Sequence, residues 1–188
     1  MSTLHVENLK GLSSGGNANK IIIPSGQTLD ASNGFVAPAG HVIQVQHTVN
    51  TTADAASVAS DYAVASGFKL SITPQFTSSK ILVIFSLDAW IDQGTNTNKI
   101  GKYAIRLNSQ SNTIVAHKRF GVNFTTGTAG SQDVGGEITL KYLDSPNSTS
   151  AQEYELVLGR WSVSYNNNVK INGGGFGHSS ITLMEIAQ

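Results

Sequence analysis

The chain is divided into short β-prone runs separated by clusters of Gly, Asn, Ser, Asp and Pro, and this pattern favours an all-β fold. Apolar and polar residues alternate within most of these runs, whereas helical periodicity is nearly absent. The expected strands are 41–49, 68–73, 80–90, 101–108, 113–119, 134–143, 153–160, 162–171 and 179–186. Nine such strands are enough for an antiparallel β-sandwich of two packed sheets.

Two stretches have an alternative interpretation. Residues 53–65 are rich in alanine, but Ser, Val and Asp interrupt them, so we expect a loop that runs into a strand, with a helix as the alternative. The residues Asn166-Asn167-Asn168 can adopt left-handed backbone angles. Residues 161–171 therefore form either one strand or one hairpin.

Alternation within a run indicates which side chains face the core. In the run that begins at Glu153, we expect Tyr154, Leu156 and Leu158 to point inward and Glu153 and Glu155 to face water. The runs around Ile105 and Leu140 follow the same rule, with a charged residue outward.

The run Ile81-Leu82-Val83-Ile84-Phe85 departs from this rule because it is apolar on both faces. Such a strand is either central in a thick core or covered on its outer face by another subunit. A sandwich with one solvated side favours the second explanation. Ile81, Val83 and Phe85 are therefore candidate subunit-interface residues.

A doublet precedes these strands: Pro24-Ser25-Gly26 and Pro38-Ala39-Gly40, with the prolines fourteen residues apart. Proline followed by glycine can end an extended piece and reverse the chain. A repeat this short cannot bury an apolar face without a neighbouring rung or another copy. We therefore expect a short β-stem over 20–40, with Ile22 and Leu29 as further interface candidates; two unrelated loops are the alternative.

The remaining organisation follows from this division. Residues 41–188 are expected to form a β-sandwich head domain, and residues 1–19 an N-terminal docking segment with one short strand at 4–9. Leu4, Val6 and Leu9 are the candidate docking residues of that segment.

Composition excludes several classes of partner. Lys and Arg total 12 and balance 12 Asp and Glu, charged residues make up only 13%, and no basic cluster is visible. Neither nucleic-acid binding nor an anionic membrane surface is therefore expected. There is no cysteine, so disulfides and thiolate metal sites are not expected. The first residues lack the pattern of a signal peptide, and no run is long enough to span a bilayer, which predicts folding in a cytosol.

No motif predicts catalysis, a cofactor or a metal. Asp88 and Asp92 flank Trp90, but residues four apart on a strand are roughly 13 Å apart, wider than the about 5–9.5 Å between paired glycosidase carboxylates. The five histidines have no ligand spacing, and the glycines at 173–175 lack the Lys-Ser/Thr ending of a phosphate loop. We expect no enzyme. A glycan platform remains an alternative, with Trp90, Asp92, Phe120, Phe124 and Phe176 as candidate host or glycan contacts on a strand end and loops.

Segments at 22–30, 37–44, 72–83, 142–147 and 180–187 together resemble tail-fibre and related virion structural proteins of marine tailed bacteriophages. The resemblance covers about residue 20 to the C-terminus and includes no catalytic motif. It implies a homotrimer, with a stem around a three-fold axis and a jelly-roll-like β-sandwich head. It also implies a virion component assembled in the host cytoplasm and docked on other virion proteins.

The short stem departs from a long fibre, so three locations stay open: a tail tip, a short capsid fibre or spike, and a decoration protein. The expected function is that of a non-enzymatic structural component of the virion. The alternatives are a receptor-recognition module for host-surface glycans or proteins and, least favoured, a polysaccharide-cleaving enzyme.

Overall fold

The computed structural model describes residues 10–11, 13–18, 20–28, 38–56, 63–92, 98–123, 133–162, 167–173 and 177–188. The chain divides into two compact units, Met1–Val36 and Ala37–Gln188. The described residues of the smaller unit contain turns and bends but no strand. The β-character expected for residues 20–40 is therefore not seen in the described part of that segment.

Both Pro-x-Gly sequences form the same turn. The Gln27 N–H donates to the Pro24 carbonyl oxygen (3.1 Å), and the His41 N–H donates to the Pro38 carbonyl oxygen (3.2 Å). The glycine in the third position has a positive φ in each turn, 82° at Gly26 and 86° at Gly40. A glycine in this position is what a type II turn requires. The expected chain reversals are confirmed.

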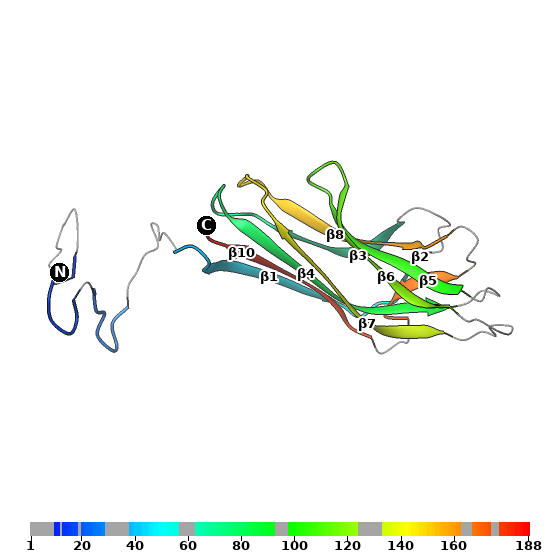
Figure 1. Cartoon of the computed structure of the whole chain (residues 1–188), viewed down its shortest axis with the longest axis horizontal. Coiled ribbons are helices and arrows are strands. Elements are labelled where there is room, and N and C mark those ends of the chain that lie inside the picture. The colour runs from blue at the N-terminus through cyan, green and yellow to red at the C-terminus, as the bar shows by residue number, and fades with distance from the viewer. Residues whose placement is uncertain are drawn as a thin grey trace. The chain divides into compact units, whose positions relative to one another are not determined.

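The larger unit is a sandwich of two antiparallel sheets (Figure 1). The first sheet contains β1 (Val42–Asn50), β2 (Asp54–Ala56), β4 (Lys80–Asp92), β7 (Val134–Asp144), β9 (Asn168–Ile171) and β10 (Ser179–Ile186). The second sheet has the order β3 (Ala63–Ile72), β8 (Gln152–Arg160), β5 (Asn98–Leu107) and β6 (Thr113–Asn123). The expected all-β sandwich is confirmed at this level.

The long strand β4 organises the first sheet. β7 pairs with it from Ile81 to Ile91 along one edge. On the other edge β10 pairs with the first part of β4, and β9 pairs with its last part. β1 then pairs with β10, and β2 pairs with β9. β1 and β2 thus form one interrupted strand, and β9 and β10 form another, beside β4.

Asn172 lies at the gaps in these two interrupted strands and links the chain across them. Its backbone has φ of 55°, and its N–H donates to the Asp88 carbonyl oxygen (2.9 Å). Its Nδ2 donates to the carbonyl oxygens of Asn50 (2.8 Å) and Thr52 (3.0 Å), while Ser179 Oγ donates to its Oδ1 (2.9 Å). Asn172 and Ser179 are buried, so these bonds satisfy polar groups that water does not reach.

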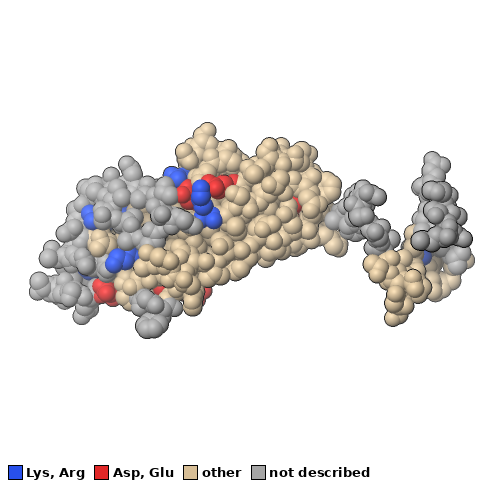
Figure 2. All heavy atoms as spheres, turned by 180° about the vertical axis from the view of Figure 1, so that it is seen from behind, with Lys and Arg blue, Asp and Glu red and all other residues tan. Residues whose placement is uncertain are grey.

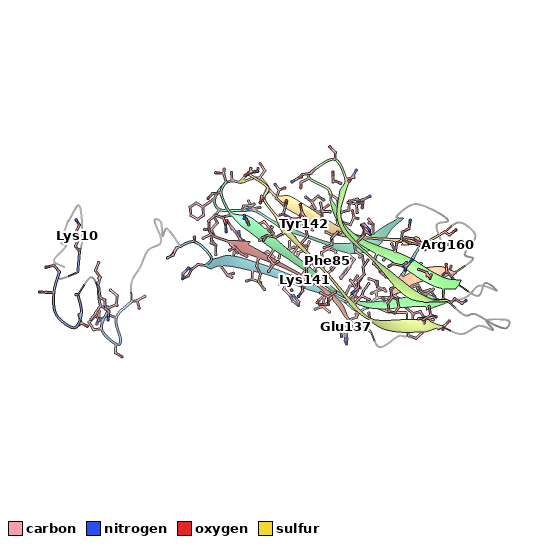
Figure 3. All side chains as sticks on the ribbon, viewed as in Figure 1. Lys10, Phe85, Glu137, Lys141, Tyr142 and Arg160 are labelled. Carbon is pink, nitrogen blue, oxygen red and sulfur yellow. The ribbon has the colours of Figure 1, made fainter. Side chains whose placement is uncertain are left out.

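The core lies between the sheets and is built from alternate residues of β4 and its partners. The β4 side chains at 81, 83, 85, 87, 89 and 91 are all 0% exposed. They face Tyr103, Ile105 and Leu107 of β5 and Tyr154, Leu156 and Leu158 of β8. Phe85, labelled in Figure 3, meets Phe68 edge-on at 6.0 Å between ring centroids. The inward direction expected from alternation in β8 is confirmed.

Three expectations need correction. The described part of 53–65 holds the short strand β2 and the start of β3, and β2 raises the number of strands from nine to ten. In the run 162–171 only Asn168–Ile171 is a described strand, and it pairs with β4 and β2. Glu155 does not face water, because it is 4% exposed and pairs with Arg106 Nη2 at 2.5 Å. The Arg106 guanidinium offsets the cost of burying that carboxylate.

Tyr103 ties the two sheets together through its hydroxyl. This buried β5 side chain donates toward the carbonyl oxygens of Trp90 (3.2 Å) and Lys170 (3.0 Å) in the first sheet. Burial raises the pKa of the Tyr103 hydroxyl far above its usual range, so it stays a neutral donor.

We expect Tyr103→Phe to lower the free energy of unfolding by about 1–2 kcal/mol, because the hydroxyl bonds are lost while the ring stays packed. Chemical denaturation with unchanged m-value measures this change. Tyr142→Phe is the control, since the half-buried Tyr142 hydroxyl bonds to no described residue. Equal effects in the two variants would contradict the inter-sheet role of Tyr103.

Candidate functional site

The two faces of β4 have different roles. Ile81, Val83 and Phe85 are 0% exposed inside one copy of the chain and belong to its core, so their expected place in a subunit interface is wrong. Leu82 and Ile84 alternate with them and point to the outer face of the sheet, where they are half-buried. The run is apolar on both faces because one face fills the core and the other contributes to an apolar surface.

The register of the first sheet places four apolar side chains of that surface in one line. Val45 of β1 pairs with Met184 of β10, Met184 pairs with Leu82 of β4, and Leu82 pairs with Leu143 of β7. We call these four residues the apolar row. Val45 and Leu143, at its two ends, are 51% and 49% exposed. Directly paired side chains lie within contact distance across a sheet, so the row is a continuous apolar surface.

The rows become polar farther along β4. Thr182, Ile84 and Lys141 form the next line, and Ser180, Ser86 and Thr139 form the one after it, which we call the hydroxyl row. Val49, 52% exposed, pairs with Ser180 and extends the hydroxyl row to the β1 edge. The outer face thus changes from large apolar side chains to small hydroxyl side chains within a few residues.

The far end of this face carries acidic residues and a tryptophan. Asp88 pairs with Glu137, and Trp90 pairs with Gly135. A Cβ atom at Gly135 would lie 2.3 Å from Trp90 Cε3, and one at Gly173 would lie 2.4 Å from Trp90 Cγ. The indole therefore rests against the backbone at both glycines and is half-buried. Any larger residue at these two positions would displace it.

Burial raises the pKa of Asp88 above its ordinary value. Its directly paired neighbour Glu137 is also acidic and is exposed. Like charges directly opposite each other on neighbouring strands are destabilising. Asp88 and Glu137 thus place two carboxyl groups side by side at this end of the face. Lys170 of β9 pairs with Trp90 on the same face and already has an interaction of its own.

A buried carboxylate lies beneath the other end of the face. Glu185 of β10 is 0% exposed and accepts hydrogen bonds from the Gln75 N–H (2.8 Å), the Phe76 N–H (3.3 Å) and Gln44 Nε2 (2.6 Å). It fixes the connection between β3 and β4 and the first part of β1. Sequence reasoning missed this residue, although alternation places it on the same face as Ile181 and Leu183.

The candidate contact residues do not gather into one site. Phe120 lies in β6 and packs against the core, with its ring edge-on to Tyr103 at 6.3 Å, so it is not an open loop aromatic. Ile22 belongs to the smaller unit and is 56% exposed. Leu4, Val6, Leu9, Leu29, Phe124, Phe176 and the side chain of Asp92 lie outside the described residues.

Charged side chains are sparse on the side of the molecule seen in Figure 2. The blue and red atoms gather in one part of the larger unit, and the end where β10 finishes and β1 begins is almost wholly tan. Among the described residues, no three His, Asp or Glu side chains are grouped as metal ligands. In the same part of the chain, no helix is long and apolar enough to cross a membrane.

Comparison with known proteins finds remote likeness among solved structures. No protein-family model and no curated protein matches the chain. Among solved structures, a mutant VP2 protein of infectious bursal disease virus in derived T=1 particles has a TM-score of 0.36 and 11% identity. A structure of the Gx strain of that virus has a TM-score of 0.32 and 14% identity. The matches cover 88% of this chain but only 41% and 43% of those chains. Likeness at these scores carries no inference about function.

The raised pKa of Asp88 predicts a pH dependence. A carboxyl group whose pKa is higher in the folded state favours folding below its unfolded pKa and loses that contribution as pH rises toward the folded pKa. We therefore expect Asp88→Asn to raise the melting temperature slightly at pH 7 and to have little effect near pH 3. Glu137→Gln, which removes the neighbouring exposed carboxylate and leaves Asp88 buried, is the matched comparison and should change the melting temperature less. A lower melting temperature of Asp88→Asn at pH 7 would contradict the prediction.

Proposed function

We propose that this chain is a non-enzymatic structural subunit of a bacteriophage particle, a short trimeric fibre or spike on the tail or capsid surface. The family resemblance at 22–30, 37–44 and the later segments supports the phage setting and the trimer. The sandwich and its apolar outer face support a role in assembly. No cofactor or catalytic group is part of the proposal.

The strand order supports a jelly-roll head. When β1 with β2 and β9 with β10 are each counted as one interrupted strand, each sheet has four strands. The first sheet then has the order β7, β4, β9/β10, β1/β2, and the second has β3, β8, β5, β6. Two four-stranded antiparallel sheets with this long-range pairing fit the double-sheet jelly roll, an architecture of viral capsid and lectin domains.

The observation that carries the proposal is the exposed apolar surface in both units. In the smaller unit, three consecutive isoleucines, Ile21, Ile22 and Ile23, are 52%, 56% and 43% exposed. In the larger unit, the apolar row lies on the open face of a sheet. Contiguous exposed apolar surface in a soluble protein marks an interaction site. We assign the isoleucines to the contact around the three-fold axis of the stem.

Host recognition is a second role of the same particle component, in which the loops at the ends of the strands contact a host-surface glycan or protein. Half-buried Trp90 and inward-packed Phe120 are poor members of such a surface. We therefore assign the host contact to the loops and not to Trp90 or Phe120.

The trimer is tested by native mass spectrometry of the full chain. We expect assemblies in multiples of three chains of 19.8 kDa, with the trimer as the smallest stable unit at micromolar concentration. Ile22→Asp is expected to abolish the trimer, because a carboxylate would be buried in the apolar contact. Ser25→Asp, at an exposed polar position of the same unit, should keep it. An unmodified chain that is monomeric, or an Ile22→Asp chain that stays trimeric, contradicts the proposal.

A further inference from the structure

The outer face of the first sheet carries two charges of opposite sign, Lys141 and Glu137, that form no ion pair with any described residue. Lys141 and Glu137 are exposed on β7, four residues apart, and Figure 3 labels both. In the described part of the chain the ion pairs are Lys69–Glu153 and Arg106–Glu155, so Lys141 and Glu137 have no ionic partner there. Four residues along a strand correspond to about 13 Å, too far for a direct contact between the two.

Thr139 lies midway between Lys141 and Glu137, in the hydroxyl row with Ser86 and Ser180. A two-fold axis that runs along the hydroxyl row exchanges the two ends of the face. It places Lys141 of one copy opposite Glu137 of a second copy, and the reverse. It also places Leu82, in the apolar row, opposite Trp90 of the second copy, because each lies four residues from Ser86.

We infer that a second copy of this chain packs antiparallel on the outer face of the first sheet, with the two-fold axis along the hydroxyl row. The arrangement is isologous, so each contact occurs twice. It gives Glu137 a lysine from the other copy, and it covers Leu82 of the apolar row with Trp90. The inference is independent of the virion role and of the three-fold contact, which uses the smaller unit.

The dimensions of the face suit such a contact. Four strands at about 4.8 Å give a width of about 19 Å, and the rows from Leu82 to Trp90 extend about 30 Å, or roughly 600 Å² in projection. A stable interface needs about 800 Å² of accessible surface per partner, and side chains raise the accessible area above the projection. The small Ser86, Thr139 and Ser180 side chains at the centre permit the close, aligned approach of two sheets.

The charge pattern also selects the occupant. A partner of one sign would satisfy either Lys141 or Glu137, but would repel the other. A second copy in antiparallel orientation pairs each Lys141 with a Glu137, and the chain as a whole has no net charge that would oppose association. A parallel arrangement, with the two-fold axis along β4, would instead place Lys141 opposite Thr182 of the second copy.

Cross-linking tests the axis directly, because the chain has no cysteine. Ser86→Cys is made in the full Ile22→Asp chain, which lacks the proposed three-fold contact, and is treated with a short bis-maleimide that spans the roughly 10 Å between packed sheets. We expect covalent dimers from Ser86→Cys. The control Lys118→Cys, exposed on β6 of the second sheet, should stay monomeric. Equal cross-linking of both variants, or none of Ser86→Cys, overturns the inference.

Charge reversal tests the pairing of Lys141 with Glu137. In the same background, Lys141→Glu and Glu137→Lys are each expected to raise the dimer dissociation constant about a hundredfold in sedimentation equilibrium, because each substitution removes two symmetric charge pairs at about tenfold per pair. The double variant should regain most of the affinity, because each pair is restored with reversed sign. Circular dichroism confirms that the exposed substitutions leave the fold intact. A double variant as weak as the singles overturns the antiparallel contact.

The two proposals fail separately. If the unmodified chain forms no trimer but Ser86→Cys still cross-links in the Ile22→Asp chain, the stem assignment alone is contradicted. A stable trimer of the unmodified chain, together with no cross-link of Ser86→Cys in the Ile22→Asp chain, would contradict the two-fold contact alone.

Discussion

The structure depends on the burial of one face of β4. Six alternate side chains of this strand, from Ile81 to Ile91, are fully buried and contact both the neighbouring strands and the opposite sheet. Full burial of a large apolar side chain contributes roughly 1.5–3 kcal/mol relative to leaving it exposed, and β4 buries five such side chains besides Ala89. Because three strands pair with β4, the position of β7, β9 and β10 follows from it. The register of these pairs then decides which side chains share the outer face.

Polar groups inside the sandwich are satisfied by specific partners, and these fix the arrangement that apolar burial alone would leave loose. Tyr103 joins the sheets through two carbonyl oxygens, and Tyr154 donates to buried Asp144 at 2.7 Å. Glu185 fixes the chain before β4. Each of these groups would cost free energy if it were buried without its partner, so alternative registers are disfavoured. These buried hydrogen bonds therefore help to hold the strand register that aligns the side chains of the outer face.

Both inferred contacts between copies follow from apolar surface that the fold leaves open. The stem contact uses isoleucines of the smaller unit, and the sheet contact uses the row from Val45 to Leu143. The sparse charge of the chain makes the few unpaired charges on the sheet informative, because they limit how two copies can be oriented. A sandwich with one open face and a short segment with exposed isoleucines is well suited to a repeating structural assembly.

The sequence by itself determined the all-β class, the two Pro-x-Gly turns, most strand positions and the inward face of β8, because these depend on local alternation and on turn residues. It identified the two-sided apolar run but placed the core-facing side chains Ile81, Val83 and Phe85 in a subunit interface, since periodicity does not say which of two apolar faces meets the opposite sheet. It also placed Glu155 in water, because nothing nearby in the sequence marks Arg106 as its partner. Only the tertiary structure decided the pairing of β4 with three strands, the bonds of Asn172 across the two interrupted strands and the alignment of the apolar row. All of these join residues far apart in the chain, and their register is set by packing between sheets, which local sequence does not encode.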